Sequence, residues 1–147
     1  MELFNMTNTP KSGLHQTLTA TNDVLQGYDT MLPRADAEIA GVIAELTTMH
    51  RRHANALEQR LAALGESGED DGSLQGTMNA AVVTLRDWIT GLDESSLDAV
   101  LRGEKAVMDI YDDAMTDWSS SDDPETAALL GTQFKEISEQ VARLANR

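Results

Sequence analysis

Apolar residues recur along this chain at intervals of three, four or seven positions, which is the spacing of one face of an α-helix. The pattern predicts a first helix from Leu14 to about residue 31, a turn at Leu32 and Pro33, and a longer second helix that ends near Gly65. β-branched residues do not gather into the alternating runs that half-buried strands show. The chain is therefore predicted to be all-α.

A long connection follows the second helix. The acidic stretch 66–73 has no side chain suited to a core, so we expect an exposed loop there, followed by a short helix over 73–91. The segment from Gly65 to Glu94 is long enough to travel the length of a bundle with this short helix inside it. A single long crossover is the ferritin-like connection, whereas short turns alone give an up-down-up-down bundle. We therefore predict a ferritin-like four-helix bundle with a short extra helix in the long crossover.

The last two long helices have clear start signals. Ser95 and Asp98 form a close relative of the S-x-x-E capping box, and the helix after Ser95 is expected to run through Met115. Asp123 as N-cap and Pro124 at the first helical position begin a last helix that reaches the C-terminus. Five glycines fall within predicted helices or directly before one, and we expect them to allow close helix packing: Gly13, Gly27, Gly41, Gly103 and Gly131.

Length and charge narrow the class of protein. At 147 residues we expect a single helical-bundle domain over 1–147, with 1–9 as a loose N-terminal tail. The net charge is −14, of which −12 falls on residues 65–147, and such a field repels nucleic acid and anionic membrane surfaces. The absence of cysteine excludes disulfides and thiolate sites. With no signal-peptide pattern and no apolar stretch long enough to span a bilayer, we expect a cytoplasmic location.

Several short motifs occur along the chain in a fixed order. They are Gly27-Tyr28, Leu64-Gly65, Gly72-Ser73 with Gly76, Thr90-Gly91 with Asp93, Arg102-Gly103-Glu104 with Tyr111, and Gln133-Phe134. In these motifs and their spacing, most of the chain resembles a bacterial family of ferritin-like four-helix-bundle domains of unknown function. The resemblance implies the bundle architecture and no reaction. Members of that family commonly have histidines where this chain has Asn79 and Val141, so any metal bound through those imidazoles would be lost here.

Metal binding rests on three candidate ligands. Ferritin-like oxidases bind two metal ions through carboxylates and Glu-x-x-His pairs that project into the core. The histidines of this chain are His15, His50 and His53, and no glutamate lies three residues before any of them, so a standard di-iron centre is not expected. A reduced site remains as an alternative, because His50 and His53 are one helical turn apart and the spacing of Glu104 directs it inward. Iron, manganese or zinc would suit these ligands, although the expectation is that the protein has no cofactor.

A buried Glu104 carboxylate needs partners, whether or not metal is present. The other inward polar groups are the hydroxyls of Tyr28 and Tyr111 and the amide of Gln133. We therefore predict a core polar network of Tyr28, Glu104, Tyr111 and Gln133 that fixes the register of the helices, with a histidine proton as a further partner of Glu104.

The remaining observations favour a protein without enzymatic activity. The sequence has no nucleophile elbow, phosphate-binding loop or dinucleotide fingerprint. Its basic cluster, residues 50–53 with Arg60, is expected to pair with neighbouring helices or to serve self-association. We predict a non-catalytic interaction or stress-associated bundle that forms homodimers. The alternatives are a metal-binding protein or oxidase with a degenerate site, and an assembly subunit whose acidic half binds a basic protein.

Overall fold

The computed structural model describes residues 10–65, 96–117 and 123–146, and every regular element within these ranges is helical. The elements are α1 at Pro10–Met31, the short 3-10 turn η2 at Leu32–Arg34, α2 at Ala37–Ala63, α4 at Ser96–Asp117 and α5 at Pro124–Ala145. Four long helices pack against one another, so the predicted all-α four-helix bundle is confirmed. The expected tail, acidic loop and short third helix lie outside the described residues.

Local signals explain where α2 begins and ends. The Asp36 side chain accepts a hydrogen bond from the backbone N–H of Ile39 at 2.9 Å and so caps the first turn. The chain leaves the helix through Gly65, whose φ of 84° lies in the left-handed region that favours glycine. The predicted end of this helix near Gly65 is therefore confirmed, whereas the Asp36 cap was not anticipated.

The starts of the other helices agree with the sequence in part. Asp123 accepts a hydrogen bond from the backbone N–H of Thr126 at 3.2 Å, and Pro124 is the first residue of α5, as predicted. Helix α1 begins at Pro10, four residues before the apolar pattern starts at Leu14, because proline fits a first helical turn. Ser95 lies outside the described residues, so the capping box that it was predicted to form with Asp98 remains a prediction.

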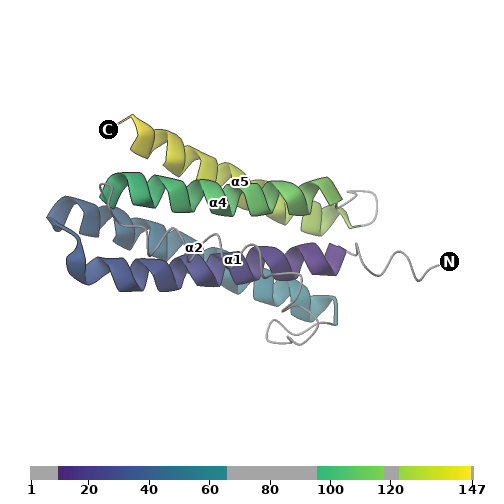
Figure 1. Cartoon of the computed structure of the whole chain (residues 1–147). Helices are drawn as coiled ribbons and strands as arrows, with labels where there is room; N and C mark the ends of the chain where they lie inside the picture. The colour runs from purple at the N-terminus through teal and green to yellow at the C-terminus, as the bar shows by residue number, and fades with distance from the viewer. Residues whose placement is uncertain (1–9, 66–95, 118–122, 147) are drawn as a thin grey trace.

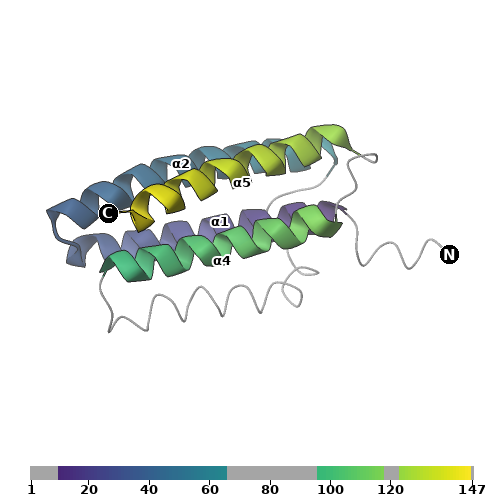
Figure 2. The ribbon, with the colours of Figure 1, turned by 90° about the horizontal axis from the view of Figure 1, so that it is seen from above.

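The bundle has two layers, with α1 and α4 in one and α2 and α5 in the other (Figure 2). Helices α2 and α4 run in the same direction, and α1 and α5 run in the opposite one (Figure 1). The three pairs of helices in most extensive contact, α1 with α4, α1 with α2 and α4 with α5, are thus antiparallel. A parallel α2 and α4 is the relation that a single long crossover produces, whereas a short turn would make them antiparallel.

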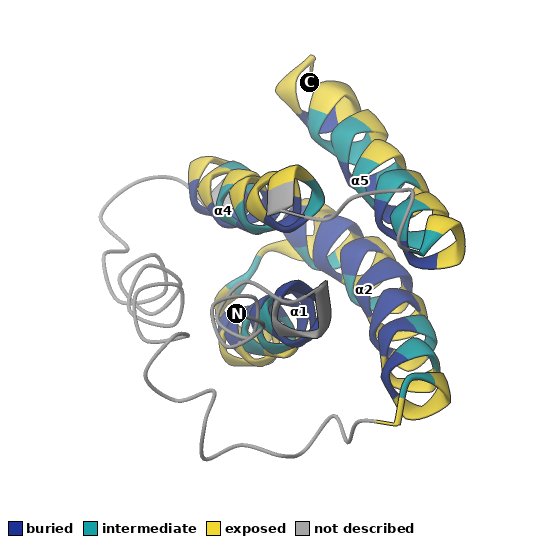
Figure 3. Ribbon diagram, turned by 90° about the vertical axis from the view of Figure 1, so that its right-hand side faces the viewer, coloured by how far each residue is buried: buried dark blue, intermediate teal, exposed yellow. Residues whose placement is uncertain are grey.

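One apolar core lies between the four helices, and the buried faces of all of them point towards it (Figure 3). Fully buried side chains come from each helix in turn, among them Leu18 on α1, Leu46 and Leu57 on α2, Val107 on α4 and Ile137 on α5. They recur at the three- and four-residue spacing that the sequence shows. The core is therefore the common seam of four amphipathic helices.

The glycines within helices differ in what surrounds them. A Cβ atom at Gly13 would approach the Cβ atom of Ala114 to 3.3 Å, so α1 and α4 pack closely at this point, as expected. At Gly41 and Gly131 a Cβ atom would meet nothing within 4 Å, so the prediction of close packing is wrong there. Both lie in helix interiors, at points where no other described helix comes within 4 Å of the added atom.

We expect Gly41→Ala to raise the free energy of unfolding by about 0.5–1 kcal/mol, because alanine loses less backbone entropy in an exposed helix interior. Urea denaturation followed by circular dichroism measures the change. Gly13→Ala is the matched control, and it should give a smaller gain or a loss because of the contact with Ala114. Equal gains from both variants would contradict the close packing of α1 on α4.

Candidate functional site

Glu104 on α4 is fully buried at the centre of the bundle. It lies on the same face of the helix as Val100, Val107 and Tyr111, which are also buried, so its inward position follows from the helical period. Its carboxylate accepts a short hydrogen bond from the Tyr28 hydroxyl on α1. The structure therefore brings together two members of the predicted core network.

His50 on α2 is the third partner of this group. Its Nε2 atom lies 2.9 Å from Oε2 and 3.1 Å from Oε1 of Glu104, and the His50 side chain is fully buried. Burial raises the pKa of the Tyr28 hydroxyl well above its ordinary value, and the charge and hydrogen bond of Glu104 raise it further. Tyr28 therefore keeps its proton and remains a donor, and Glu104 ties α1, α2 and α4 together.

Tyr111 and Gln133 form a second group in the core. The Tyr111 hydroxyl on α4 donates a short hydrogen bond to Oε1 of Gln133 on α5. The Gln133 Nε2 atom donates in turn to the backbone carbonyl of His53 at 3.3 Å, which joins α5 to α2. Burial raises the pKa of Tyr111 well above its ordinary value, so this hydroxyl also stays protonated. The four residues predicted as a network thus belong to two groups of hydrogen bonds.

We expect Tyr111→Phe to lower the free energy of unfolding by about 1–2 kcal/mol, because it leaves the buried Gln133 carbonyl oxygen without its donor. Chemical denaturation of the two proteins measures the difference. Adding Gln133→Leu to the phenylalanine variant removes the unsatisfied oxygen as well, so it should cost less than the two single changes together. Strict additivity would show that the hydrogen bond contributes nothing.

His53 does not bind Glu104 but turns to Glu136 on α5. Its Nε2 atom lies 2.9 Å from Oε1 of Glu136, and the Arg52 guanidinium makes two hydrogen bonds, of 3.0 and 2.7 Å, to the same carboxylate. These Arg52 hydrogen bonds bring the pKa of Glu136 down to about 2. Burial lowers the pKa of His53, and the hydrogen bond to Glu136 only partly opposes this, so the imidazole is neutral at pH 7 and donates from Nε2.

The sequence did not identify Glu136. The only available signal was its position one helical turn after Gln133, which would have placed it near the same face of α5. Its neighbours Phe134 and Ile137 fit the apolar stripe of this helix, whereas Glu136 itself does not. Its role depends on the register between α2 and α5, which no pattern within one helix determines.

The predicted metal ligands do not converge on one point in this arrangement. His50 and Glu104 are in contact, whereas His53 is held by Glu136, and the two imidazole rings are 6.0 Å apart and edge to face. The Nδ1 atoms of both histidines are buried and have no hydrogen-bond partner among the described residues. Those residues contain no group of three or more His, Cys, Asp or Glu side chains placed to hold a metal ion. A metal centre at His50, His53 and Glu104 stays a prediction.

The basic cluster pairs with a neighbouring helix. Besides Arg52, which binds Glu136, Arg60 on α2 makes a 2.8 Å ion pair with Asp123 at the start of α5 and a 3.2 Å pair with Glu125. The Arg60 Nε atom also donates to the Thr126 hydroxyl at 2.8 Å. The hydrogen bond from Arg60, and next the one from Thr126, lower the pKa of Asp123 to about 2. These contacts connect α2 to α5 along their outer edges.

Fold and core together define the class of protein: a four-helix bundle whose helices are cross-linked by hydrogen bonds between a carboxylate, imidazoles and phenols at its centre. The chain belongs to the family described as Domain of unknown function (DUF2383), which matches residues 11–117. No curated protein and no solved structure matches it. The resemblance seen in the sequence is thus confirmed as far as a domain of unknown function, and ferritin-like ancestry stays a prediction.

Of the helices that the structure describes, none combines the length and the apolar character that crossing a bilayer requires.

Proposed function

We propose that this protein is a non-catalytic interaction module, in which the core polar network holds four helices in one register so that their outer faces form a constant binding surface. The observation that carries the proposal is the state of Glu104. Both carboxylate oxygens have a hydrogen-bond partner within the bundle, and the side chains of Tyr28, His50 and Glu104 are at most 1% exposed. A substrate has no access to the residue best suited to acid–base chemistry.

This arrangement suits a structural role. Hydrogen bonds between helices that are fully satisfied specify one packing arrangement, whereas an apolar seam alone permits neighbouring registers. The Tyr28, His50 and Glu104 group sets α1, α2 and α4 relative to one another, and the Gln133 contacts add α5. A module that binds through its outer faces benefits from such fixed geometry because less conformational freedom is lost on binding.

Site-specific photo-crosslinking in cells tests the proposal. A photoreactive residue at an exposed alanine, Ala44 or Ala62 on α2 or Ala142 on α5, should give reproducible intermolecular adducts, and one at the buried Val100 should give none. The same adducts should form when the chain carries Glu104→Gln, because the interaction does not depend on chemistry at Glu104. The absence of adducts from every exposed position would contradict the proposal.

A metal-binding role is the second candidate, and one observation favours it. The buried Nδ1 atoms of His50 and His53 lack partners among the described residues, and imidazole nitrogens bind iron, manganese and zinc. Elemental analysis of protein purified without added metal tests this role. Stoichiometric metal that disappears in a variant with His50→Gln and His53→Gln would establish it, and metal content well below one ion per chain would exclude it.

A further inference from the structure

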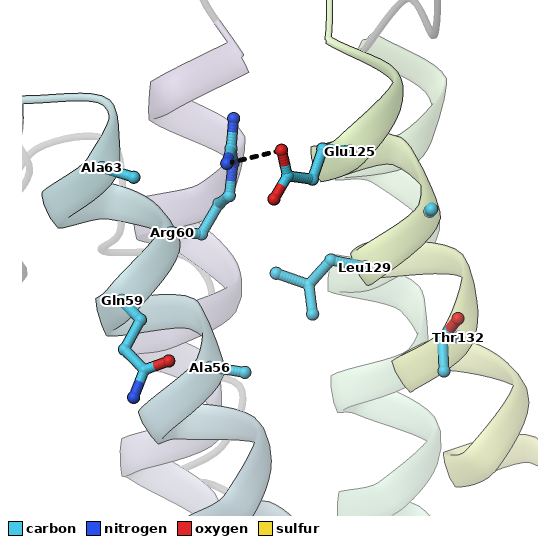
Figure 4. A pocket seen from close by; sticks show the side chains of 8 residues that line it. Ala56, Gln59, Arg60, Ala63, Glu125, Leu129 and Thr132 are labelled. Atoms are coloured by element: carbon cyan, nitrogen blue, oxygen red, sulfur yellow. Dashed lines mark ion pairs between the residues drawn. The ribbon is translucent and has the colours of Figure 1, made fainter.

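An open groove lies between α2 and α5 near the C-terminal end of α2 (Figure 4). Its volume is about 440 Å³. Ala56, Gln59 and Ala63 line it from α2, and Ala128, Leu129 and Thr132 line it from α5. Helices α1 and α4 lie behind it, so the groove opens on the outer face of the α2 and α5 layer (Figure 4).

The packing of these two helices leaves this space unfilled. Alanine side chains would let two helices approach closely, yet a groove remains here, with the Leu129 side chain pointing into the gap from α5 and the small Ala56 and Ala63 side chains on α2 (Figure 4). At one end the Arg60 side chain spans the gap to Asp123 and Glu125. Since unfilled apolar space loses dispersion contacts, a side chain from outside this chain would stabilise the groove by entering it.

Charge selects which partner can approach this face. Helix α2 carries three acidic and three basic residues, and α5 carries three acidic and two basic ones. Helices α1 and α4 together carry eight acidic and three basic residues. Two copies of a chain with a net charge of −14 repel each other. Among the described helices, the repulsion is smallest when the nearly neutral α2 and α5 of the two copies face each other.

From these two observations we infer that the groove and its rims bind a second copy of this chain about a two-fold axis, so that the α2 and α5 layers of the two copies face each other. In such an isologous contact the same patch is used twice, so it must be self-complementary. The exposed lining residues Ala63, Ala128 and Thr132 are small, so the same patch on two copies can approach closely and meets this requirement. The inference rests on the proposed interaction role and names its first partner.

Analytical ultracentrifugation over a dilution series tests the inference with the full chain. Ala128 is exposed and lines the groove, so Ala128→Glu should weaken dimerisation about tenfold or more without disturbing the core. Ala142→Glu makes the same change at an exposed position of α5 outside the groove, and it should leave the dissociation constant unchanged. Thr132→Arg is a second groove variant, and circular dichroism verifies the helical content of each protein. Added salt should strengthen the dimer by screening the net repulsion.

Three results would overturn the inference. A chain that is monomeric at every concentration while it still forms photo-crosslinks to other proteins would leave the proposed function standing without this dimer. A dimer that Ala128→Glu and Thr132→Arg leave intact would place the interface elsewhere. A salt-sensitive complex with a basic protein, lost on Asp112→Lys and Asp113→Lys, would show that the acidic face of α4 is the binding surface. These results differ from a failure of the proposed function, which would show as the absence of photo-crosslinked adducts from every exposed position.

Discussion

Glu104→Ala is expected to lower the free energy of unfolding by about 3–5 kcal/mol, the largest effect of any single change considered for this chain. The substitution removes the acceptor of two buried donors, the Tyr28 hydroxyl and the His50 imidazole, on two other helices. Neither donor can turn to water, because both side chains are at most 1% exposed. Urea denaturation of the variant and the wild type gives the difference directly.

Conservative variants separate the hydrogen bonds from the volume of the side chain. Glu104→Gln keeps the shape and one acceptor oxygen, so about 1–3 kcal/mol should be lost. Tyr28→Phe removes one donor, and in the Glu104→Ala background it should cost much less than in the wild type, because the hydroxyl has already lost its acceptor. A loss below about 1 kcal/mol for Glu104→Ala would mean that the carboxylate is not held as the structure describes.

How much of this bundle the sequence could predict depends on whether each feature is local. The start of α5 at Asp123 and Pro124 was predictable, because an N-cap and a first-turn proline act within a few residues. The inward position of Glu104 was predictable too, since it follows from the helical period alone. Both features are properties of one helix and require no knowledge of its neighbours.

Partners across helices were not predictable in the same way. The direction of His53 towards Glu136 depends on how far α5 is shifted along α2, and the periodicity of either helix is compatible with several shifts. The expected close packing at Gly41 failed for the same reason, because a glycine in a helix does not reveal whether another helix approaches it. The groove beside Leu129 is likewise a relation between two helices. Sequence patterns therefore predicted the helices and the inward residues, while the structure supplies the pairing between them.

The pairing of His53 with Glu136 and Arg52 leads to the second large effect, a loss of stability in acid that occurs in two separate pH ranges. Burial lowers the pKa of His53 below the value of 6.5 that it has in the unfolded chain. As the pH falls, His53 is therefore protonated in the unfolded chain before it is protonated in the folded protein. The free energy of unfolding is thus at its full value above pH 6.5 and decreases as the pH falls below 6.5. One proton limits the slope to about 1.4 kcal/mol per pH unit. His53→Gln should remove this range and make the second, carboxylate range smaller, because the His53 hydrogen bond also contributes to the low pKa of Glu136.

The second range belongs to the carboxylates. Glu136 has an ordinary pKa of 4.5 and a pKa of about 2 in the folded protein, so its contribution is present above pH 4.5 and is lost as the pH falls from 4.5 towards 2. Because the Glu136 side chain is 33% exposed, screening by solvent reduces this contribution to about 1–2 kcal/mol. The pKa of Asp123 falls from 3.8 to about 2 and adds to the loss in the same range. Urea denaturation at a series of pH values from 8 to about 2.5 resolves the two ranges.

Variants of neighbouring arginines distinguish this explanation from general acid denaturation. Arg52→Gln removes the main cause of the low Glu136 pKa, so the loss below pH 4.5 should shrink. The same change should make the loss below pH 6.5 smaller, because the charge of Arg52 contributes to the low pKa of His53. Arg51→Gln alters net charge equally at the next position, which is exposed, and should leave both ranges as in the wild type. Equal effects of the two variants would mean that net charge, rather than the contacts of Glu136 between α2 and α5, determines the stability of the bundle in acid.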